Sequence, residues 1–182
     1  CMLPGRGSSN GVDISRFEKT AERFQTARGI RRKLDIPIDA PVVGFVGRLT
    51  RDKGIVELAE AFRAVLEIHP EARLLLVGEF ESGDPVPQDT IDWLRSNPAV
   101  CVAGFSKGPA DYYSVMDLLA FPSYREGFPN VPLEAAAASI PVVGFAATGT
   151  VDAVVNGKTG TLVPLGDVAG LVNAISEYLS ND

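Results

Sequence analysis

The sequence predicts an α/β fold in which a parallel sheet of about six strands carries helices on both faces. Three observations predict it. Short, uninterrupted apolar runs, which are typical of strands buried on both faces, recur along the chain. Between them lie segments whose apolar residues return at the spacing of amphipathic helices. Glycine-bearing loops with charged side chains follow several of the runs, at the strand ends where open parallel sheets bind ligands.

Residues 1–40 precede this alternation, and we assign them to a linker and a first helix. Residues 1–14 are rich in Gly and Ser and are predicted to form a loop. Residues 15–34 are polar, with weak helical character. A basic cluster in this stretch is interpreted as a solvated helix face rather than a binding site; it consists of Arg28, Arg31, Arg32 and Lys33.

Residues 41–182 are predicted to form the α/β domain itself. The predicted strands are 42–46, 72–77, 100–103, 118–121, 141–145 and 161–163. The predicted helices are 54–69, 89–95, 110–116, 131–138, 151–155 and 168–179. Strands that alternate with helices in this order imply parallel βαβ units, so the predicted architecture is a Rossmann-like, doubly wound sheet.

Composition narrows the classes of function. The 182 residues fit one domain of ordinary size, and 46% of them are hydrophobic, as in globular proteins. The net charge of −6 argues against nucleic acid as the main partner, because phosphate contacts need a positive surface. Cys101 is predicted to be a buried small hydrophobe, and His69, the single histidine, to lie at the surface or cap a helix.

Cysteine and histidine usage also bears on metals and on location. No CxxC pair or histidine cluster has the spacing of metal ligands, so no metal site is expected.

With no apolar run of about 18 residues, no membrane-spanning helix is expected. We interpret the chain as cytoplasmic. Because it begins with Cys1 rather than methionine, we expect it to be a fragment or a processed product.

The loop after the first strand is the first candidate site. In residues 47–54, Arg48 and Lys53 stand between a buried strand and a helix, and Gly54 precedes the helix. The strand end and the helix start can bring both cations to one crevice, where the helix N-terminus adds free N–H groups. That combination suits a diphosphate. A charged surface loop in which Gly54 serves the turn is the alternative that these residues leave open.

The loop after the fourth strand is the second candidate site. Glu126 lies in a glycine-bearing loop, and Glu134 lies about one turn inside the next helix. In a crevice, such carboxylates accept hydrogen bonds from sugar or ribose hydroxyls, and the loop between them can offer backbone N–H groups to a phosphate. Taken singly, each glutamate is more readily explained as a solvated surface charge.

Two other motifs are incomplete. No G-x-G-x-x-G follows the first strand, which disfavours a nicotinamide dinucleotide domain. Residues 157–159 resemble the end of a phosphate-binding P-loop, but Asp152 stands where that loop requires glycine. A turn before the last strand is the simpler interpretation of this segment. The loop at 146–150 also follows a strand and is either part of the same crevice or a plain helix start.

In combination, the motifs resemble the C-terminal domain of GT-B fold glycosyltransferases of family GT4, the "group 1" retaining family. Residues 126–135, Glu-Gly-Phe-Pro-Asn-Val-Pro-Leu-Glu-Ala, look like the E-x7-E motif of that family. Three further segments match in order: residues 10–13 with Phe17, residues 46–49 with 53–54, and residues 156–160 with 162–164. Gly149 is followed by Thr150, where many members carry a second glycine.

The resemblance implies a role for each motif residue. Arg48 and Lys53 would hold the donor diphosphate and stabilise it as it leaves, and Glu126 would contact hydroxyls of the donor sugar. Glu134 would bind the ribose hydroxyls. Residues around these would contact the sugar, the phosphate or the base: Gly127, Phe128, Pro129, Asn130, Val131, Phe105 and Ser106. The family as a whole needs no divalent metal, and no cofactor beyond the donor substrate is expected.

The resemblance implies that the domain binds the donor substrate of a glycosyl transfer. The sugar would be transferred from a nucleoside diphosphate sugar with retention of its anomeric configuration. UDP is the expected nucleotide, and the expected acceptor is a saccharide or a lipid-linked saccharide. A complete member also has an N-terminal acceptor-binding domain, so residues 1–182 alone are not expected to catalyse transfer, and the full enzyme could visit a membrane surface. The alternatives are a non-catalytic nucleotide-binding module, a sugar-nucleotide epimerase of the same fold, and a nicotinamide dinucleotide domain.

Overall fold

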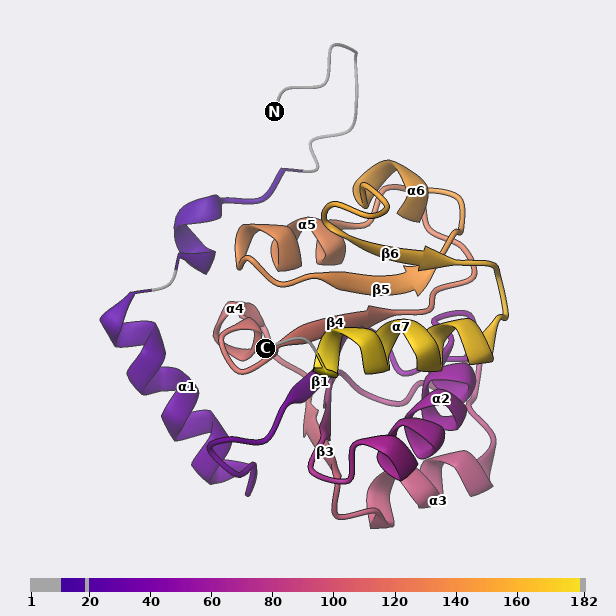
Figure 1. Ribbon diagram of the computed structural model, residues 1–182, viewed down its shortest axis with the longest axis horizontal. Helices are drawn as coiled ribbons and strands as arrows, with labels where there is room; N and C mark the ends of the chain where they lie inside the picture. Colours follow the sequence, from indigo (N-terminus) through magenta and orange to yellow (C-terminus); the bar gives the residue numbers. More distant parts are fainter. Residues whose placement is uncertain (1–10, 19, 181–182) are drawn as a thin grey trace.

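The computed structural model describes residues 11–18 and 20–180 (Figure 1). Residues 1–10 of the predicted loop over residues 1–14, and with them residue 10 of the first matching segment, lie outside the described residues. In the described residues one sheet contains the strands β1 Val42–Val46, β2 Arg73–Val77, β3 Val100–Gly104, β4 Leu118–Phe121, β5 Val142–Phe145 and β6 Gly160–Val163. Every pairing is parallel, and the order is β3-β2-β1-β4-β5-β6. The predicted fold class is confirmed.

Helices cover both faces of this sheet (Figure 1). The 3-10 helix η1 Ile14–Phe17 comes first, and the α-helices are α1 Ala21–Lys33, α2 Ile55–Ile68, α3 Gln88–Ser96, α4 Ala110–Tyr113, α5 Asn130–Ala137, α6 Thr150–Ala153 and α7 Val168–Ser180. One core cluster joins α2, α3 and α7 to the sheet, and a second joins η1, α1, α4 and α5 to its other face. The sheet is therefore buried on both sides, as its uninterrupted apolar strands predict.

The strands divide their side chains between the two clusters because successive residues of a strand point to opposite faces. Val43 and Phe45 of β1 lie in the cluster under α2, whereas Val42 and Val46 lie in the cluster under α4 and α5. Burial of one such side chain contributes roughly 1.5–3 kcal/mol. Cys101 is buried in the second cluster, as predicted.

The strand order creates a switch point between β1 and β4. From β1 the chain winds outward through β2 to β3, and from β4 it winds the other way through β5 to β6. The loops that leave the carboxyl ends of β1 and β4 therefore start side by side and diverge to helices on opposite faces. Open α/β sheets bind their ligands in the crevice at such a point.

One part of the basic cluster on α1 was wrongly predicted to be solvated. The Arg31 side chain is 13% exposed. Its Nη1 donates to the carbonyl oxygens of Pro37 and Ala40, at 2.8 and 2.9 Å, and its Nη2 donates to the carbonyl oxygen of Val115 at 3.2 Å. The segment after α1 folds back along the helix and supplies these acceptors, which helical periodicity does not reveal. Arg31 therefore ties α1 to the start of the sheet.

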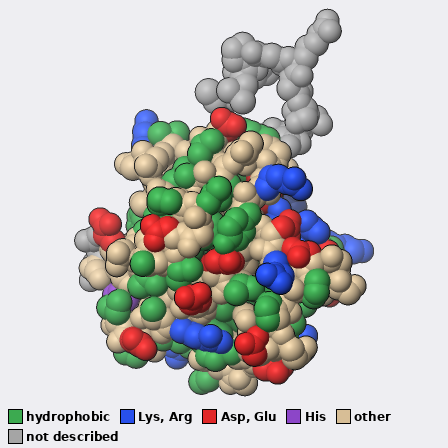
Figure 2. All heavy atoms as spheres, turned by 90° about the vertical axis from the view of Figure 1, so that its right-hand side faces the viewer, with side chains coloured by type: hydrophobic (Ala, Val, Ile, Leu, Met, Phe, Trp, Pro, Cys, Tyr) green, Lys and Arg blue, Asp and Glu red, His purple; other side chains and the backbone are tan. Residues whose placement is uncertain are grey.

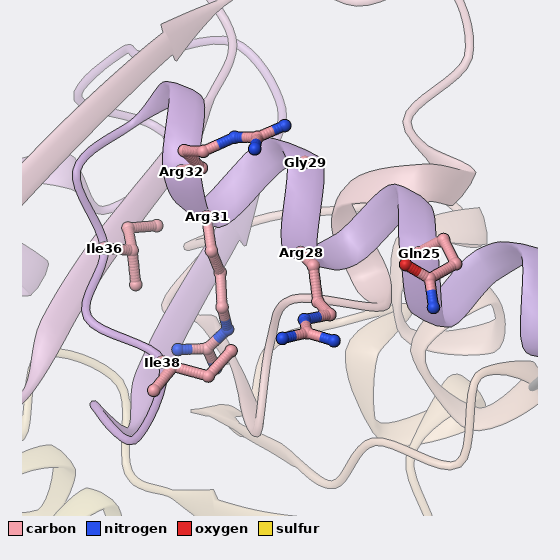
Figure 3. A pocket seen from close by; sticks show the side chains of 7 residues that line it. All are labelled: Gln25, Arg28, Gly29, Arg31, Arg32, Ile36 and Ile38. Carbon is pink, nitrogen blue, oxygen red and sulfur yellow. The ribbon is translucent and has the colours of Figure 1, made fainter.

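The other members of the basic cluster are exposed, as predicted: Arg28, Arg32 and Lys33. The three arginines of the cluster border a pocket of about 440 Å³, together with Ile36 and Ile38. Figure 3 shows Arg28 and Arg31 pointing from α1 toward Ile38, and Arg32 pointing away. Because Arg31 is bonded to the carbonyl oxygens of Ala40 and Val115, shortly before β1 and β4, the pocket lies near the amino ends of these strands, away from the switch-point crevice at their carboxyl ends.

His69 caps α2, in agreement with the prediction, but it is buried rather than at the surface. Its backbone N–H donates to the Val65 carbonyl oxygen at 2.7 Å, and the residue is 9% exposed. Its Nδ1 lies 3.7 Å from a carboxylate oxygen of Glu71.

Candidate functional site

The loops after β1 and β4 meet at the switch point, where their backbones are in close contact. Gly54 ends the loop after β1 and is the N-cap of α2, with φ of 71° in the left-handed region. A Cβ at this position would collide with the carbonyl oxygen of Pro122, directly after β4. Two residues further on, the N–H of Tyr124 donates to the Asp52 carbonyl oxygen at 3.0 Å. Only glycine permits this close approach.

The loop after β5 joins the same group. The Glu126 N–H donates to the Thr148 carbonyl oxygen at 3.2 Å. Gly149 has φ of 80°, and a Cβ there would collide with the carbonyl oxygen of Gly127. The loops after β1, β4 and β5 therefore form one continuous rim at the carboxyl ends of the strands. This favours the interpretation of residues 146–150 as part of the crevice over a plain helix start.

Lys53 and Glu126 form an ion pair across this rim. Lys53 Nζ lies 2.6 Å from Glu126 Oε1, although the two residues are 73 positions apart in the sequence. Each side chain is only 16% exposed. The pair is thus partly desolvated, so the charges interact more strongly than a surface pair does. The structure brings together two residues that the sequence assigned to one site.

Arg48 is the more exposed cation of the site, at 54%. Its Nη2 lies 3.5 Å from an oxygen of Asp52, and its Nη1 lies 3.3 Å from an oxygen of Glu81. Surface ion pairs of this kind are worth about 0–1 kcal/mol, so the guanidinium can exchange these carboxylates for another anion at little cost. Glu81 was missed in the sequence, where it is one charge among several in a polar loop.

Asp52 organises the loop between the two cations. Its partial burial alone would raise its pKa. The Thr50 hydroxyl, which donates to the Asp52 carboxylate, acts in the opposite direction. The cations of Lys53, Arg48 and Arg125 add to that effect, and the pKa of Asp52 lies below its ordinary value. Asp52 is therefore a charged anchor at neutral pH and holds Arg48 beside Lys53.

Glu134 lies on α5 and is held by Tyr113 of α4. The Tyr113 hydroxyl donates to Glu134 Oε2 at 2.7 Å. Tyr113 is 1% exposed, and Glu134 is half-buried rather than fully solvated. Burial, followed by the charge and the hydrogen bond of Glu134, raises the pKa of Tyr113 well above its ordinary value, so the phenol stays a donor. Tyr113 was not recognised in the sequence.

The segment between the two glutamates is the start of α5. Pro129 is the N-cap of α5 and is buried, whereas Gly127 and Asn130 are exposed and Phe128 and Val131 are half-buried. The first N–H groups of an α-helix have no acceptor within the helix. They and the positive end of the helix dipole therefore offer an anion site beside Glu126.

Phe105 and Ser106 follow β3, two strands away from β1 in the sheet. Phe105 is 67% exposed, and the Ser106 hydroxyl accepts a hydrogen bond from the Gly108 N–H at 3.3 Å. Among the residues that the structure describes, the Ser106 hydroxyl makes no hydrogen bond to the charged residues of the rim. An exposed aromatic ring at this edge remains available for stacking on a flat ligand.

Figure 2 faces the side of the molecule toward which the arrowheads of β5 and β6 point in Figure 1. Acidic and basic side chains are interspersed on this face, with no broad patch of one sign. An anionic ligand would therefore depend on a few local cations and on helix N-termini.

The described residues include no group of three His, Cys, Asp or Glu side chains that could hold a metal ion. Within the same part of the chain, no helix has the length and apolarity needed to cross a membrane.

Comparison with known proteins identifies what this architecture is similar to. Residues 40–181 match the family described as "Glycosyl transferases group 1". The chain is 32% identical over 178 residues to the capsular polysaccharide biosynthesis glycosyltransferase CapM of Staphylococcus aureus, a match that covers 98% of this chain and 46% of CapM. It is 34% identical over 180 residues to the D-inositol 3-phosphate glycosyltransferase of Corynebacterium jeikeium, which covers 94% of this chain and 42% of that protein.

Among solved structures, that of Anabaena HepE in complex with UDP-glucose superposes with a TM-score of 0.81. The two sequences are 28% identical, and the match covers 94% of this chain and 47% of HepE. The chain thus spans about half the length of the relatives that it matches.

Proposed function

We propose, from the premise that the chain belongs to the group 1 glycosyl transferases, that residues 41–182 are the donor-binding domain of a retaining enzyme of family GT4. In this proposal the domain binds a nucleoside diphosphate sugar in the crevice between the loops after β1 and β4. Residues 1–40 are the linker and the first helix that lead into it. The single observation that carries the proposal is the convergence of Arg48, Lys53 and Glu126 at the switch point of the sheet, with Lys53 and Glu126 2.6 Å apart.

The chemistry assigned to this site is electrostatic. When the sugar leaves the donor, negative charge grows on the diphosphate, and fixed cations close to it lower the barrier. Arg48 and Lys53 are the cations in place, and the first turn of α5 adds N–H groups. Glu126, which is paired with Lys53, is assigned to the hydroxyls of the donor sugar. Glu134 is assigned to the ribose.

UDP is the proposed nucleotide, supported by the UDP-glucose in the related HepE structure. The proposed acceptor is a saccharide or a lipid-linked saccharide, which the name of CapM supports. The matched relatives are about twice as long as this chain, and we assign acceptor binding to a partner domain of that missing length. A cytoplasmic enzyme that visits a membrane surface fits a lipid-linked acceptor.

The test is titration of the chain with UDP, GDP, ADP and NAD, followed by backbone amide shifts. Shifts after Arg48 and between Gly127 and Glu134 with one nucleoside diphosphate support the donor site and identify its base. Binding of NAD alone would instead favour a nicotinamide dinucleotide domain. Absence of binding at millimolar nucleotide would contradict a donor site in this chain.

Substitution of the two cations sharpens this test. Arg48→Ala and Lys53→Ala should each weaken binding of the nucleoside diphosphate roughly tenfold, the magnitude of one lost charge-assisted hydrogen bond. Lys158→Ala is the matched control, because Lys158 lies in the turn before β6, at the opposite end of the strands. Unchanged affinity in both crevice variants would show that the site assignment is wrong.

A further inference from the structure

We propose that Tyr113 is a positioning residue that fixes the Glu134 carboxylate for a ribose and thereby makes the site prefer ribonucleotides to 2′-deoxyribonucleotides. This inference rests on the proposed function, because it concerns the nucleotide half of the same donor site. It adds a residue from α4, outside every motif recognised in the sequence, and a measurable consequence of the ribose contact assigned to Glu134.

Packing around Tyr113 fixes the position of its hydroxyl. The side chain is 1% exposed, and its ring meets the ring of Phe17 edge-on, with centroids 5.5 Å apart at 75°. A ring packed in this way has little freedom to turn. Its hydroxyl donates to Glu134 Oε2 at 2.7 Å. Because burial and Glu134 raise the pKa of Tyr113 above its ordinary value, the phenol donates to Glu134 at neutral pH.

This hydrogen bond determines what Glu134 can still do. A carboxylate accepts about four hydrogen bonds, and Tyr113 occupies one of them at Oε2. Within the described residues no protein donor is hydrogen-bonded to Glu134 Oε1. That oxygen is therefore held in position and available to accept a ligand hydroxyl. Pairs of neighbouring hydroxyls, as on a ribose, suit the two oxygens of a carboxylate whose rotamer is fixed.

Removal of the phenolic hydroxyl should loosen the glutamate without removing it. In a Tyr113→Phe variant the ring remains, so the packing against Phe17 is kept, but Glu134 loses its fixed donor and can change rotamer. A site built to hydrogen-bond a hydroxyl rejects an analogue that lacks it, because its buried acceptor is then left unpaired. Loosening the acceptor should reduce that discrimination.

The experiment compares matched pairs of nucleotides on the full chain by calorimetry: UDP with 2′-deoxy-UDP, GDP with 2′-deoxy-GDP, and ADP with 2′-deoxy-ADP. For the base that binds, wild type should prefer the ribonucleotide roughly tenfold, and Tyr113→Phe should reduce that ratio to about twofold. Tyr112→Phe is the matched control, because Tyr112 is the neighbouring residue of α4 and should leave the ratio unchanged. In a Glu134→Ala background, which removes the acceptor, Tyr113→Phe should no longer alter the ratio.

The outcomes separate this inference from the proposed function. If wild type binds a nucleoside diphosphate and Tyr113→Phe weakens both members of the pair equally, the residue has only a structural role and the inference is wrong. The inference is equally wrong if Tyr113→Phe changes neither affinity, because the ratio of ribonucleotide to deoxyribonucleotide affinity is then unchanged. In both cases the donor site stands. If wild type binds none of the six nucleotides, both the proposed function and the role of Tyr113 are overturned.

Discussion

At the scale of single residues, the cations of the crevice are paired with carboxylates of the protein itself. Lys53 is paired with Glu126, and Arg48 lies between Asp52 and Glu81. A diphosphate must take the place of at least one carboxylate at Arg48. Glu81 is the more dispensable of the two, because Asp52 also anchors its own loop through Thr50.

We therefore expect Glu81→Gln to strengthen binding of the nucleoside diphosphate about two- to threefold at low salt, with a smaller gain as salt screens the exposed pair. Glu79→Gln is the control, since Glu79 lies in the same loop and is exposed, and its substitution removes the same charge. Calorimetric titrations at two salt concentrations measure the effect. Equal gains in the two variants would point to net charge alone, and a loss in Glu81→Gln would mean that Glu81 orients Arg48 for the ligand.

At the scale of elements, Gly54 joins the first turn of α2 to the loop after β4. Its φ of 71° and its contact with the Pro122 carbonyl oxygen both exclude a side chain. Gly54→Ala should lower the free energy of unfolding by roughly 1–3 kcal/mol and also weaken nucleotide binding, because the Arg48–Lys53 loop must shift. Gly83→Ala is the control, since a Cβ there has open space. Urea unfolding followed by circular dichroism measures the difference; similar values for the two variants would contradict it.

The strands and their loops were largely predictable from the sequence, whereas several contacts between distant residues were not. Strand positions were predicted to within a residue or two because a strand buried on both faces has to be apolar throughout. The juxtaposition of Lys53 with Glu126 followed from topology, since parallel strands end at one edge. Arg31, Glu81 and Tyr113 could not be predicted in the same way. Their partners are backbone carbonyls or side chains from distant segments, and neither periodicity nor spacing encodes such contacts.

At the scale of the whole molecule, a phenol donates to a carboxylate on each side of the sheet: Tyr113 is buried, whereas Tyr124 is 37% exposed. Tyr113 lies in the cluster under α4 and α5 and donates to Glu134. Tyr124 packs its ring edge-on against Phe145, which belongs to the cluster under α2 and α7, and donates to Glu57 Oε1 at 2.8 Å. Burial, reinforced by the neighbouring carboxylate, raises the pKa of both phenols, and that of Tyr124 reaches about 12.

These shifts predict that alkaline pH loosens both layers. A phenol with a pKa raised on folding stabilises the protein fully below its unfolded pKa of about 10, and this contribution is lost as pH rises toward the folded value. The urea midpoint of wild type should therefore fall between pH 10 and 12, mainly through the buried Tyr113, because solvent screens the contribution of the 37% exposed Tyr124. A Tyr113→Phe, Tyr124→Phe double variant should be less stable at pH 8, because both hydrogen bonds are gone, and should lose less on going to pH 11. Lysine titration is common to both proteins and cancels in the comparison. Parallel pH profiles would mean that the two phenols ionise without cost to the fold, and that neither carboxylate bond holds its layer in place.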